Sequence, residues 1–376
     1  MNALEVVFLG CFVMALYPYV IYPPAVVAAS KFWGRRWHRG NACSSVTVLI
    51  SVHNEERVIR DKVENALALE YPAGRLEIVV VSDGSTDGTD AIVSSFADPR
   101  LVLKAYERAG KTACLNRAVA EVSGEILVFT DANSMFPHQV LRKIARNFSD
   151  EGVGLVTGWT KYRRPGSDEE EAPDLYARLE KFTKEGESLI SSCVGADGAI
   201  FAIRRELYRQ LEDYDINDFV IPLTVIGQGR RVVLDSEVCC LEEPSGEAKG
   251  EFRRQARITN RTLGAIRRNV QFLNPLRYGS FAFFLLSHKV LRLMVPFFAA
   301  ATVLLSTLLI STAPLYRVLS ISFAALLILG AAGILGLTRS RVVDLCATLL
   351  LTNLAQLVGW ARFVSGRADV TWTPQR

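Results

Sequence analysis

Polar and acidic residues follow three short apolar runs of this sequence, each with the Val- and Ile-rich composition of a buried strand. They are Asn54 and Glu55, then Asp83, then Asp131 and Asn133. If the runs are parallel strands, their carboxyl ends meet at one edge of a sheet, where α/β proteins bind ligands. Clustered carboxylates repel one another unless a cation or a hydrogen-bonding ligand offsets their charge. The pattern therefore predicts a binding site at this sheet edge.

Asp131 and Asn133 have the spacing of two metal ligands. The first and third residues of an extended Asp-Ala-Asn stretch point to the same side of the backbone. Two oxygen ligands on one side suit Mg²⁺ or Mn²⁺, which keep other coordination positions for water and phosphate oxygens. Each polar residue taken alone is equally typical of a turn or a helix cap. Their occurrence after three separate strands favours a binding site.

The segment from Cys43 to about Asn274 has the alternating pattern of an α/β domain. The predicted strands are Val46–Val52, Leu76–Ser82, Leu101–Ala105 and Glu125–Thr130, and the clearest predicted helices are Glu55–Leu69 and Lys111–Val122. This order predicts a doubly wound parallel sheet with helical crossovers. A dinucleotide-binding dehydrogenase is disfavoured because no G-x-G-x-x-G follows the first strand, and the sequence contains no Walker motif.

An apolar segment precedes this domain. Val6–Ser30 contains no charged residue and is long enough to cross a bilayer. No basic residue comes before it, which disfavours a cleaved signal peptide. The cations that follow, including Lys31 and Arg35, predict by the positive-inside rule that the N-terminus lies outside and the α/β domain in the cytoplasm. We therefore expect an integral protein of the inner or plasma membrane.

The C-terminal third is also apolar. Leu293–Tyr316 and Val318–Thr338 lack charges and predict a helical hairpin through the membrane. Phe281–Leu293 mixes aromatic and basic residues, which is typical of a helix in the membrane interface. Leu345–Ala361 has arginines on both sides, so its path stays open. The predicted division is an anchor (1–30), a cytoplasmic domain (43–274), an interfacial helix (275–292), membrane-associated helices (293–364) and a tail (365–376).

Charge and cysteine content narrow the expected partners. The net charge of +4 is modest, and the basic residues cluster beside apolar segments. Lipid headgroups and phosphorylated ligands are therefore expected, and a nucleic acid is not. The seven cysteines include no C-x-x-C pair, so we expect free thiols in the cytoplasmic part and no zinc site.

These motifs resemble those of the membrane-bound family-2 glycosyltransferases, the group that includes cellulose, hyaluronan and poly-N-acetylglucosamine synthases. The resemblance runs from "SVHNEE" at Ser51 to the terminal "TWTPQR". It implies a type A glycosyltransferase fold flanked by transmembrane helices. It also implies inverting transfer of a sugar from a nucleotide-sugar, usually a UDP-sugar, to a lipid-linked or growing polysaccharide acceptor, with Mg²⁺ or Mn²⁺.

The resemblance also implies roles for the donor side. Asp83 matches the residue that binds the uracil end of the donor, and Asn54 and Glu55 lie in the matching nucleotide-binding loop. Lys111 matches a lysine beside the nucleotide, although a lysine at a helix N-terminus could also be a surface residue.

The match to the family's D-x-D motif is incomplete. Asp131 matches its first aspartate, and Asn133 stands where the second is found. An amide oxygen can still ligate a hard cation. Because the site then carries one negative charge fewer, metal binding depends more on the donor diphosphate.

Two further segments resemble the acceptor and catalytic regions. In "GADGAIFAIRR", Asp197 and Gly198 match the acceptor side, although the segment could be only a loop leading into a strand. In "DINDFVIPL", Asp218 aligns with the catalytic base of the family's T-E-D motif. Asp213 and Asp215 are close enough in sequence to remain alternatives.

The segment "EFRRQARITNR" resembles the family's Q-x-x-R-W region. Arg254 stands for the glutamine, Arg257 keeps the arginine, and Ile258 replaces the tryptophan. Helical spacing places Arg253, Arg257 and Arg261 on one face, which could bind a diphosphate or anionic lipid. Because the tryptophan stacks on the acceptor sugar in processive relatives, polymer synthesis and single transfer stay open.

A non-catalytic reading also stays open. The chain could be a membrane subunit for glycan export whose catalytic step belongs to a partner protein, because Asn133, Asn217 and Ile258 depart from the family's motifs. Such a subunit would bind donor without turning it over.

Overall fold

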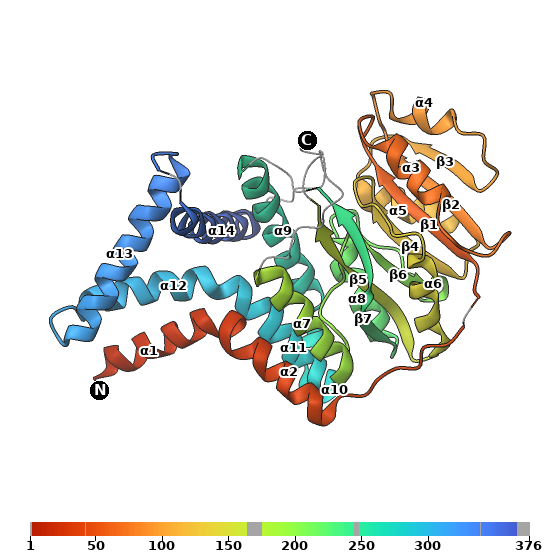
Figure 1. The fold of residues 1–376 in the computed structure, drawn as a ribbon. Helices are drawn as coiled ribbons and strands as arrows, with labels where there is room; N and C mark the ends of the chain where they lie inside the picture. The colour runs from red at the N-terminus through yellow and green to blue at the C-terminus, as the bar shows by residue number, and fades with distance from the viewer. Residues whose placement is uncertain (1, 42, 164–174, 244–247, 339, 367–376) are drawn as a thin grey trace. The chain divides into compact units, whose positions relative to one another are not determined.

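The computed structural model describes residues 2–41, 43–163, 175–243, 248–338 and 340–366. The chain divides into two compact units, whose elements are labelled in Figure 1. The helical unit comprises Met1–Pro23, Glu247–Gly264 and Leu285–Ala368, and the sheet unit comprises Pro24–Gly246, Ala265–Phe284 and Asp369–Arg376. The acidic stretch at 167–171 and residues 367–376 of the predicted tail lie outside the described residues.

The sheet unit contains a seven-stranded sheet in the order β3-β2-β1-β4-β6-β5-β7. The strands are β1 (Val46–Val52), β2 (Leu76–Asp83), β3 (Leu101–Tyr106), β4 (Ile126–Asp131), β5 (Val153–Tyr162), β6 (Phe201–Arg204) and β7 (Arg231–Glu242). β3, β2, β1 and β4 are parallel, which confirms the predicted strands and brings their carboxyl ends to one edge. β6 runs antiparallel to β4 and β5, so the other half of the sheet is mixed.

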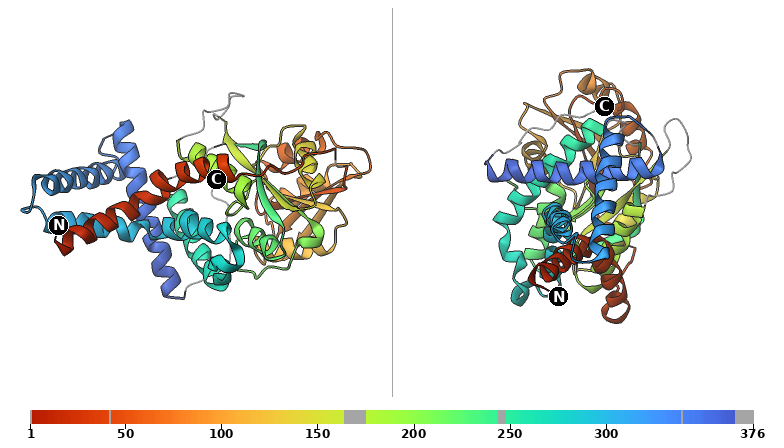
Figure 2. Two further views of the ribbon diagram at one scale, coloured as in Figure 1. Left: turned by 90° about the horizontal axis from the view of Figure 1, so that it is seen from below. Right: turned by 90° about the vertical axis from the view of Figure 1, so that its left-hand side faces the viewer.

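Helices cover both faces of this sheet (Figures 1 and 2). They include α3 (Ile59–Leu67), α4 (Thr89–Ser94), α5 (Lys111–Ala120), α6 (Val140–Ala145), α7 (Leu175–Ile190) and α8 (Asn217–Gly227). The unit also contains most of α2 (Tyr22–Trp33), and α10 (Pro275–Tyr278) and α11 (Ser280–Phe284). The helix predicted from Glu55 begins at Ile59, because the preceding residues form a loop at the sheet edge.

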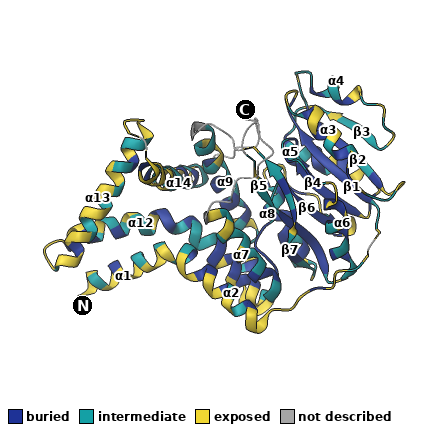
Figure 3. Cartoon of the chain, viewed as in Figure 1, coloured by how far each residue is buried: buried dark blue, intermediate teal, exposed yellow. Residues whose placement is uncertain are grey.

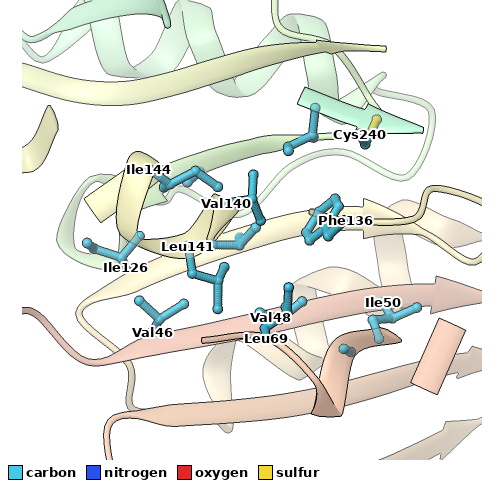
Figure 4. Packing of buried hydrophobic residues seen from close by; sticks show 14 of the residues in the cluster. Val46, Val48, Ile50, Leu69, Ile126, Phe136, Val140, Leu141, Ile144 and Cys240 are labelled. Carbon is cyan, nitrogen blue, oxygen red and sulfur yellow. The ribbon is translucent and has the colours of Figure 1, made fainter. Parts of the chain in front are cut away.

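The main core lies between the central strands and helices α3 and α6. Val46 and Val48 on β1 pack in one cluster with Leu141 and Ile144 of α6, as Figure 4 shows. β1 is buried along its whole length, which explains why all its residues but Thr47 and Ser51 are apolar. This rigid layer determines where the strand ends lie.

The helical unit contains long apolar helices. They are α1 (Ala3–Leu16), α12 (Leu291–Leu308), α13 (Pro314–Ile334) and α14 (Arg341–Val364), with π-helical turns at Tyr17–Ile21 and Leu285–Val290. Among the described residues, four helices are long and apolar enough to cross a membrane: Ala3–Trp33, Ser280–Leu308, Pro314–Ile334 and Arg341–Val364. Figure 3 shows exposed residues along α13, and Ile328 on this helix is 69% exposed.

Two membrane-region boundaries differ from the sequence prediction. The turn of the hairpin precedes Pro314, so Arg317 lies in the first turn of α13; proline at this position starts a helix readily. Within 275–292, Gly279 has a φ of 52° and separates α10 from a helix that continues to Leu308. The proposed role of 275–292 as an interfacial segment, like the rest of the domain division, stays a prediction.

A basic helix, α9 (Ala248–Arg268), belongs mostly to the helical unit. Its Thr259 lies against Gly359 of α14, where a Cβ would meet the Thr259 Cβ at 2.5 Å. The missing side chain at Gly359 thus allows a close helix crossing.

Candidate active site

Asp83, the last residue of β2, fixes the loop that leads into α5. Its Oδ1 accepts hydrogen bonds from the backbone amides of Ala109 at 2.7 Å and Gly110 at 2.9 Å, and its Oδ2 pairs with Arg108. Gly84 has a φ of 62°, and a Cβ there would lie 2.7 Å from the Arg108 nitrogen. Asp83 is 3% exposed. Its carboxylate therefore positions the start of α5, and its predicted contact with a nucleobase stays a prediction.

Asn54 and Glu55 tie the end of β1 to the loop after β2. Asn54 has a φ of 55°, a conformation that asparagine tolerates better than most residues. Its Oδ1 accepts a hydrogen bond from the Thr86 amide at 2.8 Å. The Glu55 amide donates to Thr89 Oγ1 at 2.8 Å, and the Glu55 side chain is buried. The structure therefore brings the two predicted loops together.

Lys111 and Asp131 form an ion pair across the sheet edge. Lys111 is the first residue of α5, and its Nζ lies 2.5 Å from Asp131 Oδ1 at the end of β4. A cation at a helix N-terminus is mildly unfavourable, so the carboxylate offsets that cost. A small pocket beside the pair is lined by Ser51, Val52, Val81, Asp83, Lys111 and Cys114.

The turn Asp131–Ser134 carries the predicted metal ligands. Asn133 is partly buried, and its side chain makes no hydrogen bond to the described part of the chain. Among the described residues no group of three or more His, Cys, Asp or Glu side chains could hold a metal ion. One carboxylate and one amide fit Mg²⁺ or Mn²⁺ when water and phosphate oxygens supply the remaining ligands. The residues present therefore fit a cation that binds together with a diphosphate.

Asp218 lies in the first turn of α8, against the predicted acceptor segment. Its backbone oxygen accepts a hydrogen bond from the Ala196 amide at 2.7 Å. A Cβ on Gly198 would lie 3.0 Å from Asp218 Oδ2. The segments "GADG" and "DIND", far apart in sequence, therefore meet at this carboxylate.

Asp197 shapes the same segment. Its Oδ2 accepts hydrogen bonds from the Thr160 amide at 2.8 Å and the Thr160 hydroxyl at 2.9 Å, and its Oδ1 accepts from the Ala199 amide at 3.1 Å. Burial raises the pKa of Asp197, while Lys184 and these hydrogen bonds oppose the rise. The described contacts give Asp197 a role in holding the loop that faces Asp218.

The two sequence alternatives to Asp218 lie in different surroundings. Asp215 is 5% exposed, pairs with Arg268, and accepts a hydrogen bond from the Glu212 amide at 3.2 Å. Asp213 is exposed on the preceding turn. The choice of Asp218 as the catalytic base stays a prediction.

Thr112 was not singled out from the sequence. Its hydroxyl donates to the Asp215 backbone oxygen at 2.9 Å, while the adjacent Lys111 pairs with Asp131. The start of α5 therefore contacts both Asp131 and the loop that precedes Asp218. Its position beside Lys111 was the only sequence signal.

Lys62 was also missed. It is 1% exposed on α3 and lies under the Asp131–Ser134 turn. A signal was present, because Lys62 falls at the third position after Ile59 and just before Val63, on the buried face of the predicted helix.

Arg254 and Arg257 lie on α9 in the helical unit. Arg254 pairs with Glu251 on the same helix, with its Nε 2.8 Å from Glu251 Oε2. Their predicted contact with the donor stays a prediction.

Residues 47–212 match the family model described as glycosyl transferase family 2. A probable glycosyltransferase, YdaM, from Bacillus subtilis is 38% identical over 120 residues, which are 30% of this chain and 29% of that protein. A beta-monoglucosyldiacylglycerol synthase from Nostoc is 34% identical over 116 residues, which are 30% of this chain and 25% of that protein. The matched segments thus span less than a third of these relatives.

A solved structure is similar over nearly the whole chain. It is the mannosyltransferase PcManGT from Pyrobaculum calidifontis in complex with GDP-Man and Mn²⁺. The TM-score is 0.73 at 22% identity, and the match covers 97% of this chain and 99% of that one. At this identity the likeness shows the fold, which is the type A glycosyltransferase fold. Residues 47–212 are therefore similar to glycosyl transferase family 2, and the chain shares the fold of this mannosyltransferase.

Proposed function

We propose that this protein is an inverting glycosyltransferase that moves a sugar from a nucleotide-sugar to a lipid-linked or growing glycan acceptor. One observation carries the proposal: Lys111 contacts Asp131, and its neighbour Thr112 contacts the loop that leads to Asp218. A donor diphosphate at the first pair would therefore place its sugar toward the second carboxylate. We infer a UDP-sugar as donor from the resemblance of the strand-end motifs.

Asp218 is the proposed catalytic base. A sugar hydroxyl is a weak nucleophile, and accepting its proton as the new bond forms contributes about 10²–10⁴-fold to such reactions. A Cβ on Gly198 would lie 3.0 Å from Asp218 Oδ2, so glycine at this position keeps a side chain away from the carboxylate. Attack on the face opposite the leaving group inverts the anomeric centre.

The other half of the reaction is the departure of the nucleoside diphosphate. Lys111, which contacts Asp131, would neutralise the negative charge that develops there. A Mg²⁺ or Mn²⁺ ion held by Asp131 and Asn133 would supply further electrostatic stabilisation of the diphosphate. Asp83 keeps Lys111 in position by holding the preceding backbone amides.

The acceptor is proposed to lie at the cytoplasmic membrane surface. The part of the chain that the structure describes contains four helices long and apolar enough to cross a membrane. Among the similar proteins are a beta-monoglucosyldiacylglycerol synthase and a poly-beta-1,6-N-acetyl-D-glucosamine synthase from Staphylococcus epidermidis, whose names denote a lipid product and a polymer product. The experiment therefore tests for transfer to a lipid acceptor and for transfer to a polymer.

Transfer of label tests the proposal. Membranes containing the protein receive radiolabelled UDP-sugars, or GDP-mannose, with Mg²⁺ or Mn²⁺, and the organic-soluble and high-molecular-weight products are separated. We expect label in one of these fractions and its loss, by at least about 100-fold, in Asp218→Asn. The matched control is Asp213→Asn, which neutralises an exposed acid on the preceding turn and should keep activity.

The outcomes separate the candidate functions. Transfer that survives Asp218→Asn but not Asp213→Asn would overturn the choice of base. If the protein binds donor but transfers sugar from none of the donors, the proposed enzymatic activity is wrong and the export-subunit function is favoured.

A further inference from the structure

Lys62 is a buried cation directly beneath the proposed cation-binding turn. Its Nζ donates a hydrogen bond to Thr130 Oγ1 at 3.1 Å and another to the Ser134 backbone oxygen. It also lies 4.1 Å from the centre of the Phe136 ring. The two hydrogen-bond acceptors flank Asp131 and Asn133 on either side in the sequence.

Burying a lysine is costly unless its charge is compensated. Burial lowers the pKa of Lys62 to about 8, while the nearby carboxylates of Asp131 and Glu242 oppose the shift. Lys62 is therefore still largely protonated near neutral pH. A methionine or leucine would fill the same space without this cost, so the ammonium has a structural or electrostatic role at this position.

The far side of the turn is held by β7. Ser134 Oγ donates to Glu242 Oε1 at 2.5 Å, and Met135 and Leu241 exchange two backbone hydrogen bonds of 2.8 Å each. The turn is thus held by α3 on one side and by the end of β7 on the other.

We propose that Lys62 is a positioning residue, which orients the Asp131–Asn133 turn so that a cation binds there together with a nucleoside diphosphate. The inference rests on the proposed function, because it assigns the ligand class of the same site. Lys62 touches neither ligand in this role. It holds the backbone on both sides of them and balances the charge of Asp131 from behind.

A merely structural lysine would stabilise the fold and leave ligand binding unchanged in the folded protein. The measurement that distinguishes the two roles is Mn²⁺ binding to the purified full-length protein in the presence of UDP or GDP. Electron paramagnetic resonance detects the bound Mn²⁺. Lys62→Met removes the charge and both hydrogen bonds. Thr130→Val, which removes one acceptor with little change of shape, serves if Lys62→Met does not fold. Thermal unfolding reports stability separately.

The matched control is Lys184→Met, the same change at a largely buried lysine on α7, whose side chain is 12% exposed. We expect Lys62→Met to weaken nucleotide-dependent Mn²⁺ binding about 10–100-fold, the usual cost of losing a residue that orients metal ligands. Thr130→Val should weaken it in the same direction, and Lys184→Met should leave it within about twofold of wild type on the same grounds.

The positioning role would be overturned if a folded Lys62→Met variant binds Mn²⁺ within about twofold of wild type. If Lys62→Met does not fold, the same result in a folded Thr130→Val variant would overturn it. An equal loss in Lys184→Met would overturn it too, because the effect would then follow any buried lysine. If the wild-type protein itself binds neither UDP nor GDP together with Mn²⁺, the donor and metal assignment of the proposed function fails. That result differs from a loss of binding in the variants alone, so the two failures are distinguishable.

Discussion

The Lys111 ammonium lies 2.5 Å from the Asp131 carboxylate, so a cation of the protein neutralises the acidic end of β4. A divalent ion that approaches this turn by itself meets a carboxylate already paired, plus an uncharged amide at Asn133. A diphosphate arriving with the ion would offer Lys111 a second anionic partner. We therefore expect the cation and the nucleotide to bind together.

Lys111→Met tests this arrangement. We expect kcat/KM for the donor to fall by about 100-fold, because a charge-assisted donor aimed at developing negative charge is commonly worth 10²–10³ in rate. Mn²⁺ binding without nucleotide should become tighter, since Asp131 loses its partner. Both are measured by the transfer assay and by Mn²⁺ titration. The control is Lys104→Met, which removes the lysine of the Lys104–Glu121 ion pair. It should change neither kcat/KM nor Mn²⁺ binding.

Asn133→Asp should restore the second carboxylate of the turn. Added ligand charge strengthens the binding of hard cations, so we expect the Mn²⁺ concentration for half-maximal transfer to fall by about tenfold. Asn133→Ala should raise it, because the amide oxygen is lost. A metal dependence that is the same in both variants would show that Asn133 does not ligate the ion.

Gly198→Ala places a methyl group 3.0 Å from Asp218 Oδ2. We expect transfer to fall by at least about tenfold, because a shift of about 1 Å at a reacting group can cost 10²-fold. Stability should change little. The matched control is Gly152→Ala, whose Cβ would also lie 3.0 Å from a carboxylate oxygen, that of Asp150. Equal activity of the two variants would contradict a reacting role for Asp218.

Cys114 should resist alkylation across the neutral range. Burial, followed by the nearby Asp83 carboxylate, raises the pKa of Cys114 to about 12, so the reactive thiolate stays scarce up to at least pH 9. Because the pKa is raised, reactivity should increase only at strongly alkaline pH. Iodoacetamide labelling followed by mass spectrometry should modify the exposed Cys43 and spare Cys114. Rapid labelling of Cys114 at pH 7 would show that the pocket beside Asp83 opens readily.

The sequence by itself determined the parallel half of the sheet and the polar residues at its edge. β1, β2 and β4 consist mostly of apolar residues because parallel strands covered on both faces are largely apolar. The residue that ends such a run necessarily reaches the ligand-binding edge, so Asp83 and Asp131 could be predicted from local pattern alone.

Only the tertiary structure decided which of these residues touch. The Asp131 carboxylate meets Lys111, 20 residues away, and Lys62 reaches Ser134 across 72 residues. The antiparallel placement of β6 between β4 and β5 was likewise not predicted, since its four residues carry no periodic signal of their own. Local pattern reports whether a residue is buried or lies at a strand end. Contacts between distant segments depend on how helices pack on the sheet, and this packing is a property of the whole chain.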